Sequence, residues 1–262
     1  MNRPTAMIPH NKLLRSLPPE ELSRLQHRLE WVLLKPRRVL HHARITIDHV
    51  YFVESGLVSV VANTDEENHG VEAWLIGYEG MVGIPAVLGM PSSPHRRMVQ
   101  AEGSALRMKT PDLRQLMDDL PHFRSALLRY VGSVLVQAGQ VGACNARHSL
   151  PERLARWLLM TRDRLDGNDL PLTHDVIAKM LGARRASVTE VVHSLVKSEA
   201  IAAERGLLRV LDRDKLEHLS CPCYPVLKAE FKRLSHPVEV TCHSQRQPVA
   251  EMIRSSGLHQ ES

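Results

Sequence analysis

Residues 172–201 have the sequence LTHDVIAKMLGARRASVTEVVHSLVKSEAI, and this stretch decides how the second half of the chain folds. Apolar residues recur at helical spacing on both sides of a short Gly-Ala-Arg-Arg segment. The periodicity predicts two helices, at 174–181 and at about 185–198, joined by a bend at Gly182. Thr173 is placed to cap the first helix, and Asp175 lies in its first turn.

Small and apolar residues around the glycine suit two helices that cross closely. Ala178 stands four residues before Gly182, and Val188 and Val191 follow it by six and nine residues. This spacing is the steric requirement of a helix-turn-helix, whose second helix presents its N-terminal half outward. The inward positions expected are Ile177, Leu181, Val188, Val191 and Leu195.

The outward face of the second helix is polar and begins with two arginines. Arginine bonds bidentately to guanine or to phosphate, serine bonds to either, and glutamate accepts from the cytosine amino group. We therefore predict that this face enters the major groove of duplex DNA, the alternative being an ordinary helical hairpin with a solvated face. A turn at Glu204-Arg205-Gly206 predicts a wing. The predicted DNA-binding residues are Thr173, Arg184, Arg185, Ser187, Thr189, Glu190, His193 and Arg205.

Composition sets wide limits around this motif. The 262 residues, 43% of them hydrophobic, fit two ordinary domains, and the net charge of +5 is compatible with a polyanionic partner without requiring one. The sequence contains neither a long apolar run nor a secretory N-terminus, so we expect a soluble intracellular protein that does not enter membranes. Four cysteines are too few for a secreted disulfide framework, and reduced thiols are expected.

The first half of the chain changes pattern at about residue 36. Before it, Leu22, Leu25, Leu29 and Val32 follow a Pro-Pro start at helical spacing, which predicts one leading amphipathic helix within 11–34. From there to about 109, strand-like stretches separated by turns, such as the one expected at residues 54–56, predict a small antiparallel sandwich or barrel.

A segment of roughly 28 residues after Pro121 carries apolar residues in a heptad register. It predicts a long helix through which two chains dimerise, and the alternative is a helix packed lengthwise on its own domain. The residues predicted for the dimer seam are Leu127, Val131, Val134, Ala138 and Val141.

The order of these parts resembles the Crp/Fnr family of bacterial transcription regulators: a leading helix, a β-domain with VYFVESGLVSVV, a long helix, LTHDVIAKMLGARRASVTEVV and a Gly-turned wing. The resemblance covers residues 12 to about 220 and implies an α+β fold. Its implied parts are an antiparallel, cyclic-nucleotide-binding-like β-roll at 12–120, a dimerisation helix at 121–149 and a winged helix-turn-helix at 150–222. The apolar periodicity fades after residue 223, which predicts a flexible tail at 223–262.

The resemblance further implies a cytoplasmic homodimer on a two-fold-symmetric operator, with RNA polymerase left open as another partner. Arg185 matches the family's arginine that reads guanine, whereas Ala186 and Glu190 depart from the residues frequent there, so no operator sequence is transferred. Arg184 replaces a frequent serine cap, and we expect a DNA phosphate to take the cap's role.

The roll departs from members that bind cyclic AMP. Gly80-Met81-Val82-Gly83 stands where those have Gly-Glu-x-Gly, and a thioether cannot accept a strong hydrogen bond from a ribose hydroxyl. His95-Arg96 stands in place of their Arg-Ser, with Arg96 or Arg97 left open as an anion contact. We predict no dependence on cyclic AMP and assign no cofactor.

Cysteine and histidine positions give no metal assignment. No cysteine precedes Cys144, which excludes the family's N-terminal iron-sulfur cluster. Cys221-Pro222-Cys223 with Cys144 and His148 leaves a metal or redox site open, but ordinary thiols are favoured because nothing in the sequence brings the two segments together. No nucleophile-base pair supports an enzyme. The alternative function is a ligand or redox sensor that acts through protein contacts.

Overall fold

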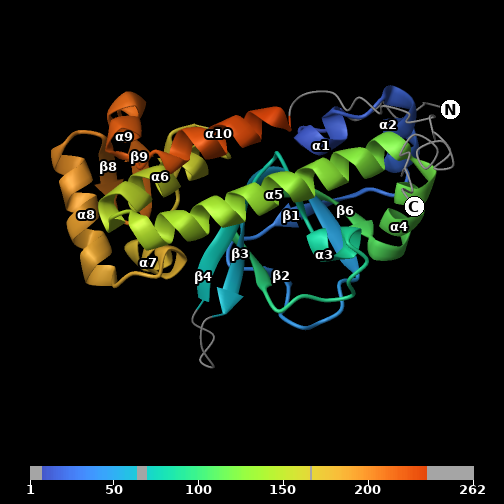
Figure 1. Ribbon diagram of the computed structural model, residues 1–262, viewed down its shortest axis with the longest axis horizontal. Coiled ribbons are helices and arrows are strands. Elements are labelled where there is room, and N and C mark those ends of the chain that lie inside the picture. The colour runs from blue at the N-terminus through green and yellow to red at the C-terminus, as the bar shows by residue number, and fades with distance from the viewer. Residues whose placement is uncertain (1–7, 64–69, 166, 235–262) are drawn as a thin grey trace, which may run out of the picture.

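The structure, a computed structural model, describes residues 8–63, 70–165 and 167–234. A β-roll and a helical domain occupy the two ends of the molecule, and the long helix α5 (Pro121–Arg147) runs along both (Figure 1). The predicted α+β fold is confirmed, with its antiparallel sheet, long helix and C-terminal helix-turn-helix.

The roll is a six-stranded antiparallel sheet in the order β1-β6-β3-β4, with β2 paired to β6 and β5 to β3. Its strands are β1 (Glu30–Leu34), β2 (Val39–His41), β3 (His49–Asn63), β4 (Gly70–Ile76), β5 (Met81–Val82) and β6 (Arg96–Lys109). The turn predicted at residues 54–56 is wrong, because β3 continues through it with shifts of register against β6. Gly56, at φ 83, supplies a β-bulge there instead of a turn.

The prediction of a single leading helix is also wrong. Two short helices, α1 (Lys12–Arg15) and α2 (Pro19–Gln26), are followed by β1, which places Val32 on a strand. Leu25 is buried and Leu22 and Leu29 pack around the same roll core. Val32 packs instead on a second apolar cluster of the roll, which contains Leu34 and Val53, so the helical spacing of the four residues does not mark one continuous helix face. Two further helices, α3 (Ile84–Val87) and α4 (Thr110–Asp119), complete the roll.

The long helix α5 packs one side on the roll. Leu127, Val131 and Val134, predicted for the dimer seam, are buried in the roll's core within the same chain, and Ala138 and Val141 are half-buried. The stripe that α5 leaves exposed is the neighbouring one, composed of Leu128, Gly132, Leu135, Gly139 and Gly142. The seam prediction needs this correction because α5 carries two adjacent apolar stripes, and periodicity does not say which one faces its own domain.

The helical domain begins where α5 ends. A capping box of Ser149 and Glu152, with Pro151 in the first turn, starts α6 (Leu150–Arg162). The elements that follow are β7 (Asp169–Leu170), α7 (His174–Leu181), α8 (Arg185–Lys197), β8 (Ile201–Glu204), β9 (Leu207–Val210), α9 (Arg213–Leu219) and α10 (Cys223–Arg233). The three short strands form a sheet in the order β7-β9-β8.

Two buried polar contacts join α6 to the roll. Trp157 donates from Nε1 to Oε1 of Glu72 on β4 at 2.8 Å. Arg164 lies just beyond the end of α6, and its Nε donates to Oε1 of Glu79 at 2.8 Å. Both side chains of this ion pair are almost completely buried. The helical domain is therefore docked against the roll of its own chain, with α7 also packed on β4.

The tail predicted from residue 223 is wrong for residues 223–233. Residues 223–233 form α10, because Tyr224 and Leu227 bury apolar surface between α5 and α6. This helix brings Cys221 and Cys223 beside Cys144. The rest of the predicted tail, 235–262, lies outside the described residues. Among the residues that the structure describes, no helix is both long and apolar enough to cross a membrane.

Candidate nucleic-acid interface

The bend between α7 and α8 is a left-handed glycine. Gly182 has φ 60 and ψ 41, and the backbone N–H of Ala183 donates to the carbonyl oxygen of Ala178 at 2.9 Å, which closes the end of α7. A Cβ at Gly182 would lie 3.0 Å from Cγ2 of Val71 on β4. Glycine is thus required both by the backbone angle and by the close approach of the roll.

Packing between the two helices follows the predicted pattern with one change. Ile177, Ala178 and Leu181 of α7 are buried, as are Val188 and Leu195 of α8. Val191, predicted to face inward, is only half-buried, and Val192 is fully buried in its place. Positions 188, 192 and 195 are one turn apart on a helix, so the centre of the contact face is one residue further along than the motif indicated.

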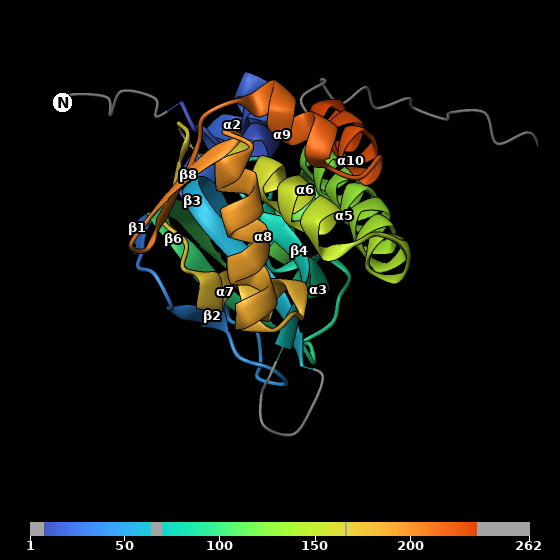
Figure 2. The ribbon, with the colours of Figure 1, turned by 90° about the vertical axis from the view of Figure 1, so that its left-hand side faces the viewer.

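The N-terminal half of α8 lies on the surface. Figure 2 looks onto this end of the molecule, where α8 faces the viewer. Arg184, Arg185, Ala186, Glu190 and His193 are exposed, which agrees with an outward polar face. Arg184 is the N-cap residue of α8 and makes no side-chain cap bond. Two cationic side chains therefore stand at the positive end of the helix dipole, an arrangement that favours an anionic partner.

Two of the residues predicted to contact DNA are only partly accessible. Ser187 and Thr189 are half-buried. The Thr189 hydroxyl donates to the carbonyl oxygen of Arg185 at 3.0 Å and lies 3.0 Å from Nδ1 of His174 on α7. Burial, followed by the charges of Arg185 and His193, lowers the pKa of His174. Thr189 and His174 thus tie α8 to α7 at the base of the outward face.

The other two predicted residues flank α8. Thr173 is exposed and caps α7 by accepting from the backbone N–H of Val176 at 3.3 Å. Arg205 is exposed at the tip of the hairpin between β8 and β9, where Gly206 has φ 79. The three short strands thus form the predicted wing, with an arginine at its tip.

In the roll, the residues compared with a cyclic-nucleotide site are used differently. Met81 is completely buried in the core, so its thioether packs against apolar neighbours. Arg97 rather than Arg96 is the buried arginine of this segment, and its Nη1 donates to the carbonyl oxygen of His95 at 2.6 Å. Burial lowers the pKa of Arg97 to about 10. The sequence named both arginines but could not tell which one faces inward.

The structure thus combines a β-roll, a long helix and a winged helix-turn-helix whose second helix has an exposed polar face. Residues 152–219 match the family model of the Crp-like helix-turn-helix domain. This match identifies the C-terminal helical domain as a Crp-like helix-turn-helix domain.

Several solved protein structures share the fold of this chain. FixK2 from Bradyrhizobium japonicum has a TM-score of 0.64 at 16% identity, covering 74% of this chain and 98% of that one. A regulator of the Crp/Fnr family from Eubacterium rectale has a TM-score of 0.62 at 18% identity, covering 79% and 96%. The c-di-GMP responsive regulator CLP from Xanthomonas campestris has a TM-score of 0.61 at 15% identity, covering 74% and 99%. No curated protein sequence matches this chain.

Proposed function

We propose that this protein is a transcription regulator of the Crp/Fnr type that binds a two-fold-symmetric operator as a homodimer, without cyclic AMP, and that α8 reads the DNA sequence. The observation that carries the proposal is the exposed N-terminal half of α8, which combines two arginines with a hydrogen-bonding face and no large aliphatic side chain. Arg185 is assigned to base reading, while Arg184 and Arg205 are assigned to phosphates. Because its partner is chromosomal DNA, we place the protein in the cytoplasm.

The exposed stripe of α5 supports the dimer. Its members, from Leu128 to Gly142, are alternately four and three residues apart, which is the spacing of a coiled-coil seam. Leu135 is 69% exposed in the single chain. A Cβ at Gly132, Gly139 or Gly142 would meet nothing within 4 Å, so a second helix has room to approach closely. A symmetric pair would present two α8 helices about 34 Å apart, matching successive major grooves.

Independence from cyclic AMP rests on the roll. Met81 supplies no carboxylate for a ribose hydroxyl, and its side chain is taken up by the core. Titration calorimetry with cyclic AMP is expected to give no heat of binding, and micromolar affinity would refute this part of the proposal.

The test of sequence reading is Arg185→Ala, with Lys197→Ala as a control. Both changes remove one positive charge from an exposed position on α8, but Lys197 lies in its last turn. An operator is first selected from random duplexes with the wild-type protein. Arg185→Ala should weaken binding to it by about 5- to 150-fold, the value of one bidentate base contact, and should relax selectivity at one base pair. Lys197→Ala should change affinity little, and unchanged selectivity in Arg185→Ala would contradict the assignment.

A further inference from the structure

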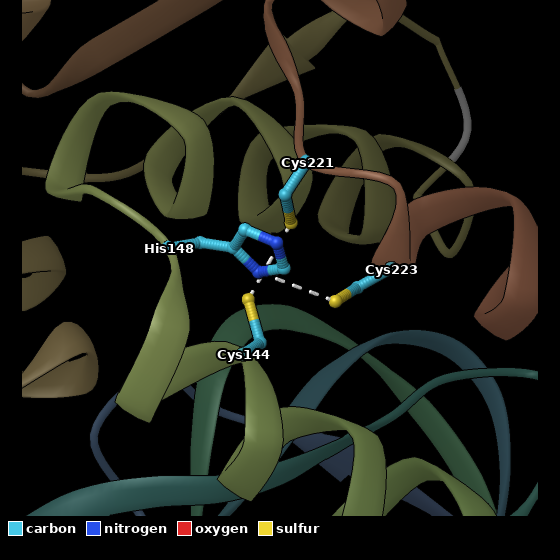
Figure 3. A group of neighbouring side chains, drawn as sticks. All are labelled: Cys144, His148, Cys221 and Cys223. Atoms are coloured by element: carbon cyan, nitrogen blue, oxygen red, sulfur yellow. Dashed lines mark hydrogen bonds between the residues drawn. The ribbon is translucent and has the colours of Figure 1, made fainter.

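Four side chains with metal-binding atoms converge where α5 ends and α10 begins. They are Cys144, His148, Cys221 and Cys223, which we call the cysteine-histidine group. Figure 3 shows the side chains of both segments pointing toward one another. The four potential ligand atoms all lie within 4.8 Å of one another. Two distances are shorter, 3.4 Å between Sγ of Cys144 and Sγ of Cys221, and 3.5 Å between Sγ of Cys223 and Nδ1 of His148.

The local fold fixes this arrangement. Cys144 and His148 are four residues apart at the end of α5, so they lie on one face of the helix. Cys221 precedes α10 and Cys223 is its first residue, with Pro222 between them as N-cap. The three sulfur atoms belong to buried residues, and the histidine is half-buried. The four donors thus come from the end of α5 and the start of α10, with His148 and Cys221 in the residues that flank these helices.

The spacing fits a single tetrahedral ion. With Zn–S bonds of about 2.3 Å and Zn–N bonds of about 2.0 Å, tetrahedral ligand atoms stand about 3.5 to 3.8 Å apart. The observed separations, from 3.4 Å up to 4.8 Å, enclose that range, so an ion needs only small movements of the donors. We propose that the cysteine-histidine group binds one Zn²⁺ ion. Three thiolates and one imidazole form a closed donor set typical of structural zinc sites.

The surroundings supply what such a site needs beyond its ligands. Gln140, one turn before Cys144 on α5, donates from Nε2 to Sγ of Cys223 at 3.1 Å, a hydrogen bond that orients the sulfur. A zinc ion with three thiolates carries one net negative charge. Arg156 of α6 is buried, and its positive charge acts on Cys144, so this guanidinium offsets the charge of the complex.

A disulfide and an iron-sulfur cluster each account for the arrangement of the cysteine-histidine group less well than a single metal ion does. A disulfide between Cys144 and Cys221 would not involve Cys223. It would therefore not account for the hydrogen bonds that Cys223 makes with Gln140 and His148. An iron-sulfur cluster puts several metal atoms between its thiolates and holds them further apart than a single ion does. The convergence of all four donors around one point therefore favours one ion.

The position of the site gives the metal a role in domain placement. His148 and Ser149 form the junction between α5 and α6, where the roll and its long helix pass into the DNA-binding domain. A metal bound here joins the end of α5 to α10 and fixes that junction, because the bond network crosses from one side of the junction to the other. Removing the ion should free the junction and lower thermal stability.

The test begins with the full chain purified under anaerobic, reducing conditions. We expect one zinc ion per chain by elemental analysis. Replacement of zinc by Co²⁺ should give the intense visible absorption of tetrahedral cobalt and a sulfur-to-cobalt charge-transfer band. Chelation should lower the melting temperature of the wild-type protein, and added Zn²⁺ should restore it, which tests the site without any substitution.

Variants then locate the ligands. Cys144→Ser is expected to lose the bound metal, whereas Cys242→Ser, which makes the same change at the cysteine outside the described residues, should keep it. Cys223→His keeps four donors and should retain cobalt binding with an altered spectrum. The proposal is overturned if the reduced wild-type protein takes up neither zinc nor cobalt, if it carries iron with sulfide, if thiol counting shows a disulfide, or if both serine variants lose metal alike.

Discussion

The buried carboxyl of Glu72 makes the docking of the DNA-binding domain on the roll depend on pH. On β4, Oε2 of Glu72 accepts from the hydroxyl of Ser59 at 2.6 Å, and Oε1 accepts from Nε1 of Trp157 on α6 at 2.8 Å. Burial raises its pKa to about 7, against the opposing effects of these two bonds and of the charges of Arg156 and Arg164. Protonation of one side chain is thus linked to the contact between two domains.

The sign of the effect follows from which state holds the proton. Between the ordinary value of 4.5 and the native value of about 7, the folded protein keeps a proton on Glu72 that the unfolded chain releases. The stabilisation that protonated Glu72 contributes to the folded protein is therefore fully present below its ordinary pKa of 4.5. It is lost as the pH rises toward and through the native pKa of about 7. At about 1.4 kcal/mol per pKa unit, a shift of roughly 2.5 units corresponds to about 3 kcal/mol of unfolding free energy.

Glu72→Gln removes the titration but preserves the contacts. A glutamine oxygen can accept from Trp157 and its amide can donate to Ser59, without a charge at any pH. We expect the variant to match wild type at about pH 4 and to exceed it by about 3 kcal/mol at about pH 8. Urea unfolding followed by tryptophan fluorescence across this range measures the difference. Glu102→Gln, at an exposed position on β6, is the control and should parallel wild type.

Two results would refute this reasoning. Parallel pH profiles for wild type and Glu72→Gln would mean that the carboxyl does not change protonation on unfolding. A variant that is less stable than wild type at high pH would mean that Glu72 is ionised in the native protein and that its charged hydrogen bonds outweigh the cost of burial.

Three further outcomes follow from the structure. Leu135→Glu on the exposed stripe of α5 should convert a dimer to a monomer by light scattering, whereas Leu88→Glu, at a comparably exposed position that is 52% accessible, should not. Gly182→Ala should cost about 1 to 2 kcal/mol in urea unfolding, because its φ of 60 disfavours a Cβ that would also press on Val71; an unchanged midpoint would show that the bend relaxes. Arg184→Ser should add about 1 kcal/mol by capping α8 and reduce the salt slope of DNA binding by about one, so an unchanged slope would exclude the proposed phosphate contact.

The sequence predicted the parts of the fold whose signals are local. The bend at Gly182, the cap by Thr173 and the wing turn at Gly206 each depend on a few neighbouring residues, and the structure contains all three. The sequence did not predict features that depend on which surfaces pack together. Leu127 and Leu128 are adjacent and equally apolar, yet one meets the roll and the other is exposed, which only the roll's surface decides.

Long-range contacts were beyond any pattern in the sequence. Cys144 and Cys221 are 77 residues apart, and Glu72 and Trp157 are 85 apart. Residues at such separations meet only because α10 folds back on α5 and because α6 docks on β4. The sequence therefore favours ordinary thiols at Cys144, Cys221 and Cys223 while leaving a metal or redox site open, and it contains no signal for the role of Glu72.

Arg156 links these two long-range features physically. Burial raises the pKa of both Glu72 and the Cys144 thiol, and the buried positive charge of Arg156 opposes that rise at each group. A zinc ion with three thiolates would place a net negative charge near the same guanidinium, which weakens its support for the Glu72 carboxylate. Metal binding would therefore favour the protonated, docked form of Glu72, and loss of the metal would let this contact weaken at a lower pH. The roll-side contact of α6 and the junction at the end of α5 thus share one charged neighbour, Arg156.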